Sequence, residues 1–217
     1  MSKVAIAGDP SGTGTFTISA PNGNTDRTLV LPDEAGTVLT SVSGLTAGNL
    51  TGSVPASAMP AGSVVQVVST TKTNRFTTTS VSYVDITGLS VTITPSSTSS
   101  KIFVSFNLNA GVSGAAGAIR LYRNGTAIAI GDPISEPADN RMTVNVYNGG
   151  DDSNSTPNVS MSTLDTPNTT SAVTYTLKAA CVQSAGTIVV NDQTSQVRNV
   201  TYAAVTASSI TVMEIAA

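Results

Sequence analysis

The stretch that decides the fold runs from 101 to 130 and reads "KIFVSFNLNAGVSGAAGAIRLYRNGTAIAI". In its first ten residues, apolar and polar side chains alternate. The apolar residues are Ile102, Val104, Phe106 and Leu108, and the polar ones include Ser105, Asn107 and Asn109. Because successive side chains of a β-strand point to opposite faces of a sheet, this alternation predicts a strand with one buried face.

A hairpin is predicted in the second half of the same stretch. The dipeptide Asn124-Gly125 separates two arms in which apolar residues alternate. Asn and Gly tolerate the positive φ angles of a type I′ turn, whose twist matches the twist of the flanking strands. Two strands therefore pair across this turn.

Strand signals continue on both sides of this stretch. Upstream they occur in "SVVQVVST", "SVSYVDI" and "LSVTIT", and downstream in "MTVNVY" and "NVSMSTL" and around Thr174, Ile188 and Ile210. No window of ten or more residues has a helical period. We therefore expect residues 62–217 to form an antiparallel, jelly-roll-like β-sandwich of roughly eight strands, in a chain of the all-β class.

Composition agrees with this class and excludes others. Charged residues make up 11% of the 217 residues, far below the ~25% of ordinary domains, and Ser, Thr, Asn and Gly favour strands and turns. The ten basic residues are spread along the chain, so we expect no nucleic-acid binding. No apolar run reaches the length of a secretory signal or a membrane span, so we expect synthesis in the cytoplasm and no membrane insertion.

Reactive side chains are scarce, since the chain has no histidine and a single cysteine. Cys181 continues an alternating apolar run and is predicted to be a packed thiol, because no histidine exists to activate it. Asp151, Asp152 and Asn154 offer oxygen ligands, but their spacing is not that of an EF-hand loop and a solvated loop is favoured. No catalytic residue, metal site or cofactor is predicted, and we expect no enzyme.

The N-terminal segment has a different pattern. Residues 15–41 read "TFTISAPNGNTDRTLVLPDEAGTVLTS" and contain three short extended runs separated by a Pro-Asn-Gly-Asn turn and a Pro-Asp break. Strands this short bury too little to be stable alone, so the segment needs a core from elsewhere. Residues 42–61 are rich in Gly, Pro, Ala and Ser and are predicted to be a linker. The predicted organisation is a module at 1–41, a linker at 42–61 and a domain at 62–217.

These segments carry a resemblance to a known group of proteins. The alternating strand followed by "RTLVLPD" and "GTVLT" resembles a module repeated in bacteriophage tail-fibre and other virion-fibre proteins. The run "YVDITGLSVTITPSSTSSKIFVSFNLNAG" followed by "IRLYRNGTAI" is similar to their C-terminal domain. The resemblance implies a homotrimer in the virion, in which three N-terminal segments complete one another's sheets and three sandwiches pack about an axis.

The resemblance also implies that the chain is a short tail fibre and that residues 1–41 dock it on the tail or baseplate of the virion. The predicted docking residues are Phe16, Ile18, Arg27, Leu29, Leu31, Val38 and Leu39. The alternative is a head fibre or decoration protein docked on the capsid through the same segment. The chain departs from long tail fibres because it has no extended shaft, and this departure favours the alternative.

Residues 131–171 are rich in Pro, Asn, Asp and Ser, and a stretch this long greatly exceeds the usual hairpin loop. A receptor-binding surface for a host glycan or protein is predicted there. Tyr147 can stack on a sugar face, and hydrogen bonds to hydroxyls can come from the polar side chains around it. These side chains are Arg141, Asn148, Asp151, Asp152 and Asn154. The alternative is that Tyr147 belongs to an edge strand and that the acidic loop is solvated.

Overall fold

A computed structural model describes most of the C-terminal part of the chain. The described residues are 11–15, 17, 22–24, 26, 28, 54–55, 58–114, 116–132, 141–147, 156–182, 186–194 and 205–217. The chain divides into two compact units, Met1–Thr51 and Gly52–Ala217. In the first unit, residues 22–24 form a bend at the predicted Pro-Asn-Gly-Asn turn. The predicted N-terminal strands and the linker lie largely outside the described residues.

The second unit is an antiparallel β-sandwich, as predicted, and its described residues contain no α-helix. They form eleven strands, more than the roughly eight expected. The predicted signals "SVSYVDI" and "LSVTIT" belong to one strand, β3, and only β2, which is three residues long, lies outside every predicted strand. The strands are β1 (Val64–Lys72), β2 (Phe76–Thr78), β3 (Val84–Ile93), β4 (Lys101–Ser113), β5 (Gly117–Arg123), β6 (Thr126–Ile128), β7 (Val144–Val146), β8 (Asn158–Asp165), β9 (Val173–Cys181), β10 (Thr187–Val190) and β11 (Ser208–Ile215).

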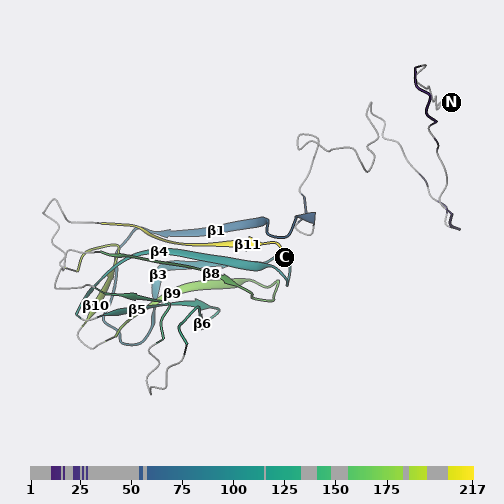
Figure 1. The fold of residues 1–217 in the computed structure, drawn as a ribbon. Helices are drawn as coiled ribbons and strands as arrows, with labels where there is room; N and C mark the ends of the chain where they lie inside the picture. The colour runs from purple at the N-terminus through teal and green to yellow at the C-terminus, as the bar shows by residue number, and fades with distance from the viewer. Residues whose placement is uncertain are drawn as a thin grey trace. The chain divides into compact units, whose positions relative to one another are not determined.

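The strands form two sheets (Figure 1). The first sheet has the order β1-β11-β4-β10-β2, with β8 also paired to β4. Since β8 and β11 both pair with the first half of β4, they occupy its two opposite edges. The second sheet has the order β3-β9-β5-β6, with β7 also paired to β5. β4 is therefore the centre of the first sheet.

The predicted hairpin is confirmed between β5 and β6. Arg123 pairs with Thr126 across the turn, and Asn124 and Gly125 have φ angles of 47° and 85°. The turn is also held to the neighbouring strand β9, because Asn124 Oδ1 accepts a hydrogen bond of 2.8 Å from the backbone N–H of Thr174. The Asn side chain thus fixes the hairpin onto the sheet as well as permitting its turn.

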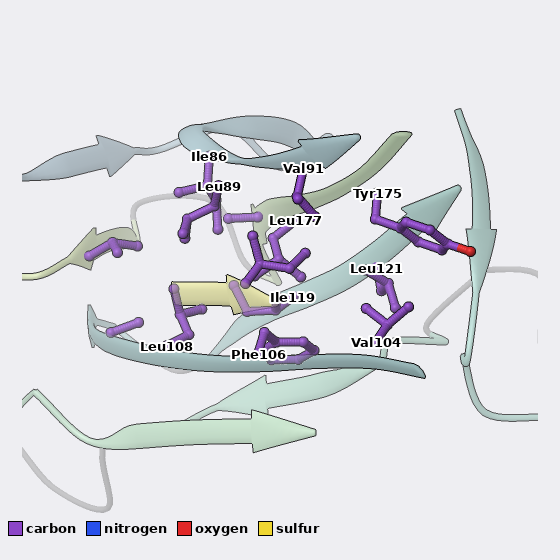
Figure 2. Close-up of a cluster of buried hydrophobic side chains, with 14 of the residues drawn as sticks. Ile86, Leu89, Val91, Val104, Phe106, Leu108, Ile119, Leu121, Tyr175 and Leu177 are labelled. Atoms are coloured by element: carbon purple, nitrogen blue, oxygen red, sulfur yellow. The ribbon is translucent and has the colours of Figure 1, made fainter. Parts of the chain in front are cut away.

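The core lies between the two sheets and is lined by their inward faces (Figure 2). The four apolar residues of β4 predicted to face inward are all buried, which confirms the alternation. They pack opposite the buried residues of β3, β5 and β9, and the largest of these on β5 and β9 are Ile119, Leu121, Tyr175 and Leu177. Cys181 is a free, buried thiol, so the packed cysteine is confirmed too. Burial raises the pKa of this thiol, against a smaller opposing effect of a backbone hydrogen bond from Ile188.

An ion pair joins the two sheets at the end of β8. Tyr175 of β9 is buried, and its hydroxyl donates a hydrogen bond of 2.6 Å to Asp165 Oδ2 of β8. Arg123 of β5 donates to the same carboxylate at 2.8 Å. Burial, together with the hydrogen bond and charge of Asp165, raises the pKa of Tyr175, so the hydroxyl stays a donor. This contact satisfies the polar atom of a core tyrosine and connects one sheet to the other.

A buried carboxylate, Glu214 of β11, closes the same end of the core. Ser96 donates both its N–H and its hydroxyl to Glu214 Oε1, at 2.7 and 2.6 Å. The Ser100 hydroxyl donates to Oε1 at 2.7 Å, and the Gln66 amide donates to Oε2 at 2.5 Å. Burial acts to raise the pKa of Glu214, but these donors outweigh it, so the pKa lies below its ordinary value. The carboxylate thereby ties the loop after β3 to the first sheet.

The Glu214 contact predicts a pH-dependent stability. Because the folded-state pKa is lowered, the stabilisation is complete above the unfolded pKa of about 4.5 and is lost as the pH falls through the folded value. Glu214→Gln should lower the free energy of unfolding at pH 7 by about 1–3 kcal/mol, and should show a smaller further loss between pH 7 and 3 than the unmodified chain. Urea denaturation at several pH values measures both effects.

The matched control is Asp85→Asn, which removes a carboxylate that is exposed. It should follow the pH profile of the unmodified chain to within about 0.5 kcal/mol. Equal pH profiles for Glu214→Gln and the unmodified chain would contradict the assigned role of Glu214.

Candidate functional site

The region predicted to bind a receptor is interrupted by regular structure. Both brief strands expected within 131–171 are confirmed, as β7 and β8. The long loop-rich stretch is therefore two separate connections, one between β6 and β7 and one between β7 and β8. Of the predicted receptor-binding residues, Arg141 and Tyr147 are described. The others, Asn148, Asp151, Asp152 and Asn154, lie outside the described residues, as do all seven predicted docking residues.

Arg141 is held to the outer side of the second sheet through its backbone. Its carbonyl oxygen accepts a hydrogen bond from Nε of Arg120 and another, of 3.4 Å, from the hydroxyl of Tyr83. Two residues later, Thr143 donates its N–H to Ile119 O and accepts the N–H of Leu121 on its hydroxyl. These hydrogen bonds hold residues 141–143 beside the edge of β5 with which β7 pairs.

Tyr147 follows directly after β7 and lies on the surface. Val146, the last residue of β7, is buried in the core, whereas Tyr147 is 63% exposed. The alternative was that Tyr147 is an edge-strand residue. In the structure the strand β7 ends at Val146, one residue before Tyr147. An exposed aromatic ring beside a sheet edge is suited to stacking on an apolar face of a ligand, such as that of a sugar.

Five residues form a cluster on the outward face of the second sheet, which we call the tyrosine cluster. Its members are Tyr83, Asp85, Arg120, Tyr122 and Lys178. Arg120 Cζ lies 4.2 Å from the ring centroid of Tyr83, and Lys178 Nζ lies 4.7 Å from that of Tyr122. The ring centroids of Tyr83 and Tyr122 lie 6.4 Å apart, and the two rings are tilted relative to each other. These are favourable cation–π and aromatic geometries.

Sequence reasoning missed this cluster because four of its members lie on three different strands and Tyr83 directly precedes one of them, β3. Register brings them together: Asp85 pairs with Lys178, and Lys178 pairs with Arg120. Lys178 also forms an ion pair of 2.9 Å with Asp85. Arg120 is only 7% exposed although it points away from the core. The available signal was the alternation in "AIRLYR", which places Arg120 and Tyr122 on the face opposite Ile119 and Leu121.

A shallow hollow of about 100 Å³ adjoins the tyrosine cluster. Ala118 and Ala180 are paired across β5 and β9, and their short side chains form its floor. Tyr83, Met142 and Val81 contribute to its rim. The hollow is smaller than the ~300 Å³ at which pockets for drug-sized ligands begin, so it accommodates at most part of a ligand, such as one ring or a methyl group.

A larger pocket of about 360 Å³ lies beside Glu214. It is lined by Met59, Val65, Ser96, Ser97, Ser99, Ser100, Ala216 and Ala217. The hydroxyls of Ser96 and Ser100 are donated to Glu214, and those of Ser97 and Ser99 bond to each other at 2.9 Å. The serine hydroxyls that line the pocket are therefore already engaged in hydrogen bonds within the fold. The part of the chain that the structure describes contains no group of three or more acidic, His or Cys side chains that could hold a metal ion.

Neither models of known protein families nor curated proteins match this chain. The described residues also contain no helix with the length and apolarity needed to cross a membrane. The tyrosine cluster combines aromatic rings with cationic groups, and Tyr147 adds an exposed aromatic ring elsewhere on the surface.

The position of Arg120 predicts that it anchors the segment 141–147. Arg120→Met keeps much of the side-chain length but removes the stacked guanidinium and the donor to Arg141 O, so the free energy of unfolding should fall by about 1–3 kcal/mol. Amide hydrogen exchange at 141–147 should become faster, because this segment loses a hydrogen bond to the sheet. Denaturant unfolding and hydrogen-exchange mass spectrometry measure the two effects.

Lys178→Met is the control on the same face. It removes a cation that stacks on Tyr122 and pairs with an exposed carboxylate, so stability should change by less than about 1 kcal/mol and exchange at 141–147 should be unaffected. Faster exchange in both variants would mean that the charge of the face, rather than the bond to Arg141, holds the segment.

Proposed function

We propose that this chain is a structural protein of a bacteriophage virion, a short tail fibre that carries a distal receptor-binding domain. The N-terminal module resembles that of virion fibres and is proposed to dock on the tail or baseplate. The observation that carries the proposal in the structure is the division into a unit at Met1–Thr51 and a compact sandwich in Gly52–Ala217. This division suits a protein that attaches with one part and presents the other.

The binding surface of the distal domain is proposed to include Tyr147 and the loops that flank β7. Tyr147 offers an exposed ring, and the tyrosine cluster on the outward face of the second sheet offers the ammonium group of Lys178 and the ring of Tyr122. Rings of this kind contact the apolar faces of sugars, while charged and amide groups bond their hydroxyls. The proposed ligand is accordingly a glycan or glycosylated protein of the host surface. The proposed assembly is a homotrimer.

A capsid head fibre or decoration protein is the second candidate. It is favoured by the shallow relief of the tyrosine-cluster face, where the adjoining hollow measures only about 100 Å³. In this case the N-terminal segment docks on the capsid and the sandwich decorates its surface.

Labelling of virions tests both candidates. Gold-labelled antibodies against residues 62–217 should bind at the tail of particles of the phage that encodes the chain, as seen by electron microscopy. Labelling over the capsid would establish the second candidate instead, and unlabelled particles would contradict both. A chain lacking residues 1–41 should fold, as judged by circular dichroism, but should be absent from the particles because its docking segment is missing.

Loop variants test the proposed receptor surface. Replacement of 148–155 by a short Gly-Ser linker, and separately Tyr147→Ala, should reduce adsorption of particles to host cells while leaving the protein folded and incorporated. Val205→Ala is a matched control, since Val205 and Tyr147 are almost equally exposed, and it should adsorb normally. Normal adsorption by both test variants would remove the receptor-binding role from this region.

A further inference from the structure

The outward face of strands β1, β11, β4 and β8 carries an unusual row of apolar side chains. These four strands lie side by side in the first sheet (Figure 1). Register places Val67 beside Met213, Met213 beside Phe103, and Phe103 beside Leu164. Val67 and Leu164, at the two ends of this row, are 54% and 51% exposed. We call these four residues the apolar row.

Small uncharged polar residues fill the two rows that follow on one side of the apolar row. The next row consists of Ser69, Thr211, Ser105 and Ser162, and the one after it of Thr71, Ser209, Asn107 and Ser160. Neighbouring side chains bond to each other within the face: the Ser69 and Thr211 hydroxyls lie 2.8 Å apart, and the Asn158 amide donates to Asn107 Oδ1. Their polar groups are therefore partly satisfied without water.

Charge is almost missing from this face. On β1, β11, β4 and β8 the outward positions include one charged residue, Lys101, at the beginning of β4. The outward face of the second sheet differs, since Asp85, Arg120 and Lys178 lie in one row there. A sheet face that is exposed to solvent normally carries polar and charged side chains. An exposed apolar row with few charges around it is typical of a contact surface.

We propose that this face is where copies of this chain pack against one another, with the apolar rows of the copies meeting in a shared core. The inference deepens the proposed homotrimer and rests on it. A second copy fits because the face has no pattern of charge for a charged partner to complement, and like faces can meet without opposing carboxylates. Lys101, at the rim, can remain in water.

The size of the face is also suitable. Four strands spaced by about 4.8 Å, with outward residues over about 27 Å, give roughly 500 Å² in projection. This is the larger part of the ~800 Å² that each partner contributes to a standard interface. Other segments of the chain can supply the rest of the interface, so association is tested on the full chain.

Charge introduced into the apolar row should separate the copies. Val67→Lys and Leu164→Lys place an ammonium group at either end of the row, where association would bury it without a partner. Light scattering on the full chain should give three times the 21.8 kDa chain mass for the unmodified protein. Each variant should dissociate at a protein concentration at least about tenfold higher and approach the mass of a single chain on dilution. Both should keep the circular dichroism of the unmodified protein, since the altered side chains are exposed.

Val81→Lys is the matched control, because Val81 is 62% exposed and lies outside this face, beside the hollow of the other sheet. It should keep the trimer mass and its concentration dependence. If either lysine variant misfolds, Val67→Ser and Leu164→Ser, which extend the neighbouring serine rows, should still weaken association at least about threefold.

The outcomes separate this inference from the proposed function. A trimer that persists unchanged in all row variants would overturn the assigned face while leaving the homotrimer intact. An unmodified chain that is monomeric at every concentration would overturn both the face and the homotrimer. Virion labelling reports on the fibre role independently of either result.

Discussion

The two-residue alternation of β4, paired on both edges with antiparallel neighbours, is the constraint on which the rest of the structure depends. β8 and β11 flank β4, and every second residue of β4 enters the core. A shift of one residue in this register would turn Ile102, Phe106 and Leu108 out to solvent and bring Asn107 and Asn109 into the core. The same alternation also decides which residues appear on the outward face.

Hydrogen bonds of buried polar groups at the ends of the strands add a second constraint on the fold. Glu214 collects donors from Ser96, Ser100 and Gln66, and Asp165 joins Tyr175 of the second sheet to the end of β8. A buried polar group without a partner costs free energy, so each of these groups is stable only when its partners are in place. They therefore select one alignment of the loops and sheets among those that the apolar core alone would permit.

The outward faces of the two sheets have different chemistry, and this difference suits them to the two roles proposed for them. The second sheet gathers cations and tyrosine rings beside the connections that flank β7, which suits recognition of a polar ligand. The first sheet presents the apolar row amid serine, threonine and asparagine, which suits contact with like surfaces. In the fibre proposed here, one sheet of each sandwich would face its copies while the other would be free to meet a host surface.

Sequence by itself determined the all-β class, the inward face of β4, the hairpin at Asn124-Gly125 and the packed Cys181, because each depends on local alternation or on the φ preferences of two residues. It also located β7 and β8. Only the tertiary structure decided the strand order, the tyrosine cluster, the donors around Glu214 and the apolar row. The members of these sets are separated by up to 148 positions along the chain, as Gln66 and Glu214 are, and become neighbours only through register and sheet packing, which no local pattern records.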